Sequence, residues 1–360
     1  MALLNLLPKE IYRALGLALV TVAAASAAGA GRSPRPPLPP EVAELQRAAL
    51  AGSSAADLAR SLSTEAGPRL AGSEGLARGV AWGLRTLAEL GFENVHAEPV
   101  TVPHWERGAA LGEIVAPFPQ TVALAALGGS IGTAENGIEA EVVATENLES
   151  LAALAPETVR GRIVYFGERM QRTRDGAGYG KTVAIRWGGA MAAAKLGAVA
   201  VLIRSVGTDS NRLPHTGSMG YEDSVKKIPA AALSNPDADL LEQAVASGQP
   251  VRFRLRLTSR TLPDVESANV VGELGGRERP EEIVVLSGHL DSWDLGTGAL
   301  DDAAGIGNVI EAARLISKLK ERPRRTIRIV LYANEEFGLS GGKTYAGAHA
   351  EEAPLHQAQD

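Results

Sequence analysis

The order of apolar segments between residues 268 and 333 constrains the fold more than any other feature of this 360-residue chain. Apolar runs at 269–274, 282–294 and 326–333 are typical of buried strands. Residues 302–319 lie between the last two runs and carry apolar side chains at helical spacing. Strand–helix–strand order predicts an α/β fold, with a mostly parallel sheet that helices cover on both faces.

The rest of the chain divides into segments of different composition. Lys9 and Arg13 precede an apolar, alanine-rich run, which is the pattern of a secretory signal peptide, with an uncleaved membrane anchor as the alternative. Helical spacing recurs over 41–62 and 74–90. The predicted organisation is a signal peptide at 1–30, a Pro-rich linker at 31–40, a helical N-terminal part of the main domain at 41–107, an inserted strand-rich domain at 108–262 and the core of the main domain at 263–360.

Composition excludes several classes of function. The chain has no Cys, which excludes disulfides, Cys-bound zinc, iron–sulfur clusters and thiol nucleophiles. A net charge of -6 and an aromatic content of 4% argue against nucleic-acid binding. No segment beyond residue 30 is apolar and long enough to span a bilayer. The chemistry must therefore rely on carboxylates, imidazoles, hydroxyls or a bound metal.

Chemically active residues follow the two strands that flank the helix. His289 and Asp291 come directly after one apolar run, and Glu335 and Glu336 come after the next. Asp301 lies at the start of the intervening helix. Each group alone is more commonly a loop pair, a helix cap or solvated surface. Because ligands bind at the carboxyl ends of strands in such sheets, we expect these residues to form one site.

An imidazole among carboxylates suits a zinc-class divalent ion, and Asp301 could bridge two such ions. Asp291 lies within reach of the second ring nitrogen of His289 and would orient that ring. One of the two glutamates could bind metal while the other accepts a proton from the attacking water. Without a cation, these acids would repel each other strongly.

Two segments, SGHLDSWDLGTGALDDAAG at 287–305 and YANEEFG at 332–338, resemble the M28 family of di-zinc exopeptidases, and within it the carboxypeptidase Q branch. The similarity extends to 67–73, 185–205 and 214–232. It implies the zinc exopeptidase fold, incomplete at the C-terminus. The strand-rich insertion resembles a protease-associated domain, which would restrict the site to short peptides.

Carried over residue by residue, the resemblance implies that His289 binds one zinc ion, Asp301 bridges two and Glu336 binds the other. Glu335 would be the general base, and Asp291 would orient His289. The expected protein is a secreted or periplasmic exopeptidase that hydrolyses dipeptides or short peptides. We expect no nucleic-acid partner and no stable membrane partner, and whether the protein forms a homodimer stays open.

The family pattern also includes a later Asp and a later His as metal ligands. Only 24 residues follow Glu336, and His349, His356 and Asp360 are poor candidates for those ligands. The chain is therefore expected to be a fragment of a longer enzyme or a product with weakened or no activity. The alternatives are a truncated, non-catalytic pseudo-peptidase that binds peptides and a single-zinc acyltransferase similar to glutaminyl cyclase.

Overall fold

A computed structural model describes residues 38–352, in two units. The predicted signal peptide at 1–30 lies outside the described residues, as do His356, Asp360 and most of the predicted linker at 31–40. The first unit, which ends at Ala51, contains α2 (Pro40–Ala51), and the second unit begins at Gly52. Within 38–352, no helix combines the length and the apolar character that crossing a membrane requires.

The second unit contains both helices and strands. Its helical segments are α3 (Ala55–Glu65), α4 (Glu74–Glu89), α5 (Leu148–Ala152), α6 (Pro156–Val159), α7 (Ala177–Thr182), α8 (Ala184–Lys195), α9 (Asn235–Ala246), η1 (Ala299–Ala303), α10 (Ala304–Ser317) and α11 (Ser340–Ala348). Its strands are β1 (Glu93–Glu106), β2 (Ala110–Ala116), β3 (Gln120–Val122), β4 (Leu124–Ala126), β5 (Ile138–Thr145), β6 (Ile163–Phe166), β7 (Ala200–Arg204), β8 (Ala230–Leu233), β9 (Arg252–Leu257), β10 (Arg260–Leu274), β11 (Arg279–His289) and β12 (Arg325–Tyr332).

The described strands form a four-stranded sheet in the order β1-β10-β12-β11 and an eight-stranded sheet in the order β3-β2-β9-β5-β6-β7-β8-β4. In the first sheet only β11 and β12 are parallel. In the second, the parallel strands are β5 to β8. The sheets are therefore mixed, and the expectation of a mostly parallel sheet is corrected. The reason is topological: the chain leaves the first sheet along β1 and returns along β10, so these neighbours run in opposite directions.

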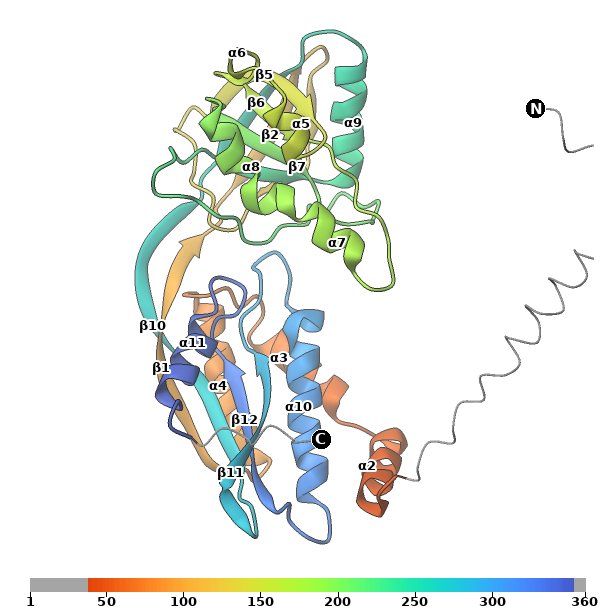
Figure 1. Ribbon diagram of the computed structural model, residues 1–360, viewed down its shortest axis with the longest axis vertical. Coiled ribbons are helices and arrows are strands. Elements are labelled where there is room, and N and C mark those ends of the chain that lie inside the picture. The colour runs from red at the N-terminus through yellow and green to blue at the C-terminus, as the bar shows by residue number, and fades with distance from the viewer. Residues whose placement is uncertain (1–37, 353–360) are drawn as a thin grey trace, which may run out of the picture. The chain divides into compact units, whose positions relative to one another are not determined.

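Strands β1 and β10 are the two long strands of the molecule, and they connect the two sheets (Figure 1). They pair from Glu93 opposite Glu273 to Glu106 opposite Arg260. The strands of the eight-stranded sheet all lie between Ala110 and Leu257. This range falls inside the insertion expected at 108–262, whose exact boundaries stay a prediction.

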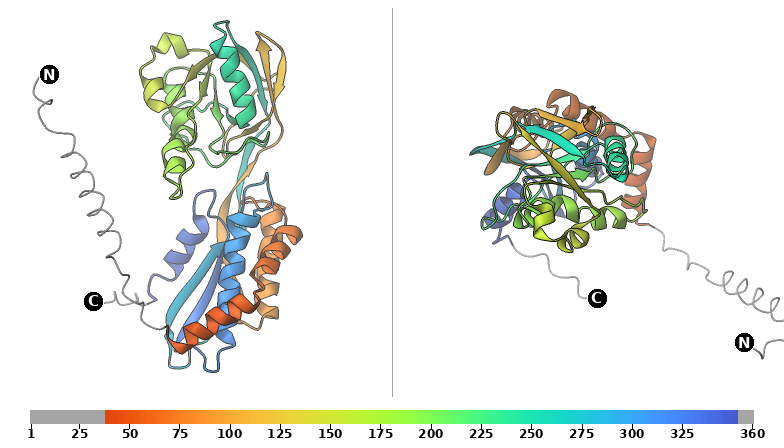
Figure 2. Two further views of the ribbon diagram at one scale, coloured as in Figure 1. Left: turned by 90° about the vertical axis from the view of Figure 1, so that its right-hand side faces the viewer. Right: turned by 90° about the horizontal axis from the view of Figure 1, so that it is seen from above.

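Alternate residues of the four-stranded sheet face two separate apolar layers. Val270 and Leu331 pack in the main core with side chains of α3, α4 and α10. Their neighbours Val271 and Val330 face the opposite way and pack against Tyr345 of α11. Helices therefore cover both faces of this sheet, as the sequence predicts (Figure 2).

The predicted elements differ from the observed ones mainly at their ends. Ser73 accepts a hydrogen bond from the Leu76 amide and caps α4, close to the predicted start. The helical pattern over 41–62 is two helices, because Gly52 and the serines after it interrupt it between α2 and α3. The strand expected over 282–294 ends at His289.

Candidate metal centre

The carboxyl ends of β11 and β12 carry the predicted site residues. His289 is the last residue of β11 and lies opposite Tyr332, the last residue of β12. Glu335 and Glu336 follow Tyr332 by three and four residues. Because the two strands are parallel and in register, both segments emerge at the same edge of the sheet.

Asp291 links these two segments. Its side chain is fully buried and accepts the amide of Glu335 at 2.9 Å and the amide of Glu336 at 3.0 Å. The Nδ1 atom of His289 lies 3.3 Å from the Asp291 carboxylate and 3.1 Å from its carbonyl oxygen. One buried carboxylate thus positions both the imidazole and the glutamate segment.

Asp301 and Asp302 approach the same histidine in different ways. Nε2 of His289 lies 3.0 Å from Oδ1 of the exposed Asp301. Asp302 accepts the backbone amide of His289 at 3.2 Å and that of Gly305 at 3.1 Å. Ligand atoms of His289, Asp301 and Asp302 lie within 4.8 Å of one another. Both oxygens of Asp302 thus bind backbone amides, one from the end of β11 and one from the start of α10, so this residue links the strand end to the helix.

Glu336 lies at the side of this cluster and is not part of the group within 4.8 Å. Its Oε2 accepts a hydrogen bond from Nε1 of Trp293 at 2.7 Å. Burial, followed by the Asp301 and Asp291 carboxylates, raises the pKa of Glu336 to about 7. Glu335 is exposed at the same strand end.

The electrostatics of the cluster suit a cation. Burial opposes a charge on His289, but the carboxylates of Asp291, Asp302 and Asp301 outweigh it and raise the pKa of His289 to about 9. The pKa of Glu336 is raised first by burial and then by the neighbouring Asp301 and Asp291 carboxylates. Nitrogen and oxygen donors in a field of uncompensated negative charge fit a zinc-class ion.

Arg69 is a buried residue of the site to which sequence analysis assigned no role. It donates hydrogen bonds to the carbonyl oxygens of Leu290 at 2.6 Å, Thr297 at 2.6 Å and Gly298 at 3.2 Å, and also to that of Gly67 at 2.8 Å. It therefore holds the loop between β11 and η1. The stretch 67–73 belongs to the recognised similarity, but a partner more than 200 residues away leaves no local signal.

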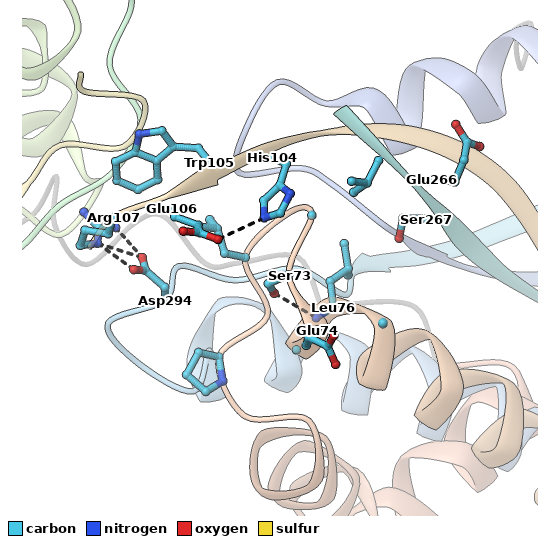
Figure 3. Close-up of a pocket in the computed structure, with 16 residues that line it drawn as sticks. Ser73, Glu74, Leu76, His104, Trp105, Glu106, Arg107, Glu266, Ser267 and Asp294 are labelled. Atoms are coloured by element: carbon cyan, nitrogen blue, oxygen red, sulfur yellow. Dashed lines mark hydrogen bonds and ion pairs between the residues drawn. The ribbon is translucent and has the colours of Figure 1, made fainter. Parts of the chain in front are cut away.

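A cavity of about 760 Å³ lies beside this loop (Figure 3). It is lined by the start of α4, the end of β1 and Asp294, whose carboxylate binds Arg107. None of the predicted site residues lines it. His349, another histidine considered in the sequence, pairs with Glu98 and Glu352 instead.

The fold and the site together define an α/β protein with a histidine–carboxylate, metal-type centre at the ends of two parallel strands. The model of peptidase family M28 matches residues 269–358. The structure of a peptidase M28 precursor from Shewanella amazonensis SB2B is 46% identical, with a TM-score of 0.84, over 87% of this chain and 70% of that one. The chain belongs to the M28 peptidase family.

Two further relatives extend this result. Mouse (Mus musculus) carboxypeptidase Q is 42% identical over 283 residues, which are 79% of this chain and 59% of the mouse protein. The present chain thus spans about 59% of the length of that relative. BSAP, a zinc aminopeptidase from Bacillus subtilis, is 22% identical with a TM-score of 0.61, over 83% of this chain and 65% of that one, and shares the fold.

Proposed function

We propose that the protein is a zinc-dependent exopeptidase of the carboxypeptidase Q type, which hydrolyses dipeptides or short peptides. The observation that carries the proposal is the buried Asp291 carboxylate. It binds the amides of Glu335 and Glu336 and faces Nδ1 of His289, so an imidazole and two further carboxyl groups are held at one strand end. Membership of the M28 family and the likeness to carboxypeptidase Q support the same activity.

His289, Asp301 and Glu336 would hold the zinc, with two ions expected when the ligand set is complete. Bound zinc supplies Lewis-acid chemistry, which polarises the scissile carbonyl and stabilises negative charge on its oxygen. Through its contact with Nδ1, Asp291 would fix the His289 ring so that Nε2 could serve as the ligand. Trp293 orients the Glu336 carboxyl through Nε1.

Glu335 is the proposed general base. Its backbone amide is held by Asp291, while its side chain is exposed at the strand end. A carboxylate placed in this way can accept a proton from the attacking water and donate it to the leaving amine. Glu335 directly precedes Glu336, a proposed ligand, so this proton transfer would take place beside the residues proposed to hold the zinc.

A pair of substitutions tests the proposal. Glu335→Gln should leave bound zinc unchanged and reduce dipeptide hydrolysis by at least about 100-fold, since it removes the base but no ligand. Asp301→Ala should lose both zinc and activity. Zinc is measured by atomic emission and hydrolysis by release of free amino acid. Glu281→Gln, at an exposed position on β11, is the matched control and should change neither. Full activity in Glu335→Gln would refute the assignment.

We also propose that the region 108–262 limits access to the site and that the protein is exported with removal of residues 1–30. The first proposal is supported by the packing of Phe337, next to Glu336, on the backbone at Gly129 and against the apolar core of the strand-rich region. Amino-terminal sequencing of the protein from its source tests the second. A mature chain that begins at residue 1 would contradict export by cleavage.

A further inference from the structure

Arg186, on α8 in the strand-rich region, is a buried cation with no acidic partner in residues 38–352. Only 8% of it is exposed. Its Nη1 donates to the hydroxyl of Tyr179 at 2.8 Å and to the carbonyl oxygen of Thr216 at 3.3 Å. Its Nε has no hydrogen-bond partner, and within the described part of the chain Nη2 has none either.

Burying a guanidinium without an anionic partner costs free energy of folding, unless a bound anionic group offsets that cost. A buried guanidinium normally has a carboxylate partner, because desolvation of an unpaired charge is strongly unfavourable. Among the described side chains with an unpartnered buried polar atom, Arg186 is the charged one. The two atoms left over, Nε and Nη2, form one edge of the planar fork, the edge that binds a carboxylate through two parallel hydrogen bonds.

The surroundings hold the guanidinium in place. The Tyr179 ring lies 5.7 Å from Cζ of Arg186 and contributes a cation–π contact. Gly217 also lies against the guanidinium, because a Cβ there would be 2.5 Å from Cζ of Arg186. The glycine is thus required for the close approach. A group already held by these contacts loses little entropy when it binds a ligand.

A short series of contacts connects Arg186 with the candidate metal centre. The carbonyl oxygen of Gly217 accepts the amide of Gly128 at 2.8 Å. The Trp293 ring packs on Gly128, where a Cβ would lie 2.1 Å from that ring. Trp293 in turn donates its Nε1 hydrogen to Glu336. The unpaired cation therefore lies on the side of the strand-rich region that contacts the proposed zinc ligands.

We infer that Arg186 binds a carboxylate group of the peptide substrate, through Nε and Nη2, with Tyr179 and Thr216 holding the guanidinium in position. This inference rests on the proposed peptidase function, and it assigns the residue that selects the substrate. The carboxylate can be the C-terminal group of a short peptide or an acidic side chain. In either case an uncharged analogue of the same size binds more weakly.

Binding titrations by calorimetry test the inference on the full chain, in the Glu335→Gln background so that the peptide is not consumed. The probes are Ala-Ala, Ala-Ala amide and Glu-Ala amide, which separate a terminal carboxylate from a side-chain carboxylate. Ala-Ala and Glu-Ala amide each carry a free carboxylate. We expect one of these two probes to bind at least roughly tenfold more tightly than Ala-Ala amide. Arg186→Gln should remove this difference, and Arg186→Lys should retain only part of it.

Arg256→Gln, on an exposed position of β9, makes the same charge change and should keep the full difference. Equal binding of all three probes, or a difference that persists in Arg186→Gln, overturns the inference. If Arg186→Gln does not fold, as judged by its thermal midpoint, Arg186→Lys and Tyr179→Phe decide instead, and unchanged discrimination in both is the overturning result. Zinc content and turnover are measured separately, so failure of the peptidase proposal is distinguishable from failure of this one.

Discussion

At the scale of single residues, the candidate site depends on buried polar side chains that belong to distant parts of the chain. Asp291 organises the strand ends through backbone amides, and Arg69 organises the following loop through backbone carbonyls. Both side chains are fully buried, so each unsatisfied group left behind by a substitution carries its full desolvation cost. These two residues therefore contribute to stability and to the geometry of the site together.

Arg69→Gln should lower the free energy of unfolding by about 2–4 kcal/mol, because carbonyl oxygens at Leu290, Thr297 and Gly298 lose a charged donor. Urea denaturation measures the change. Arg78→Gln is the control: Arg78 donates to one carbonyl, that of Ala66, and should cost about 1 kcal/mol or less. Equal losses in the two variants would contradict the positioning role.

At the scale of elements, close approach between helices places the start of α10. Gly307 lies in α10, where an added Cβ would be 2.4 Å from the carbonyl oxygen of Ala55 at the start of α3. Because this oxygen belongs to the backbone, no change of side-chain rotamer can relieve the clash. Ser54, just before α3, also donates to Glu311 of α10 at 2.5 Å. The same contact that packs the two helices thus positions the Asp301 segment.

Gly307→Ala should destabilise the protein by about 1–3 kcal/mol, because α3 and α10 must separate to admit the methyl group. In α11, a Cβ added at Gly342 would meet no atom within 4 Å. Gly342→Ala should therefore raise the free energy of unfolding by about 0.5–1 kcal/mol through helix propensity. Thermal denaturation of both variants checks the opposite signs. A stabilising effect at Gly307 would show that the two helices are not tightly packed.

At the scale of the whole molecule, the loss of stability at low pH depends on few ionisable groups. Most ion pairs of the described chain include at least one exposed side chain and contribute little. Glu311 is different, since it is 3% exposed and binds both Arg314 and Ser54. The Arg314 hydrogen bond is the main cause, against the opposing effect of burial, that lowers the pKa of Glu311 to about 2.

A pKa lower in the folded state than in the unfolded state stabilises the protein above the unfolded value. That contribution, about 3 kcal/mol at most, should disappear as the pH falls from about 4.5 to about 2. Urea denaturation at a series of pH values measures it. Glu311→Gln should have a lower free energy of unfolding at pH 6 and should lose less of it as the pH falls. Glu281→Gln should show the same pH dependence as the unchanged protein. An equal loss of unfolding free energy at low pH in Glu311→Gln and in the unchanged protein would refute this account.

Local signals predicted most elements and placed the candidate site residues at strand ends, while the roles of those residues stay a prediction. The period of the apolar residues predicted α4, α10 and the strands that became β11 and β12, because one buried face imposes its spacing on the sequence. The same signals placed His289, Glu335 and Glu336 after strands. The differences concern element ends, the division of 41–62 into two helices and the parallel character of the sheets, and strand direction is not encoded in a single segment.

The sequence alone therefore determined the α/β class, the family resemblance and the candidate metal ligands, because these follow from periodicity and residue type. Only the tertiary structure decided how those residues are held. The hydrogen bonds of Asp291, the loop contacts of Arg69 and the packing of Gly217 on the Arg186 guanidinium all join segments far apart in the chain. Such contacts depend on which surfaces folding brings together, and no local spacing records them.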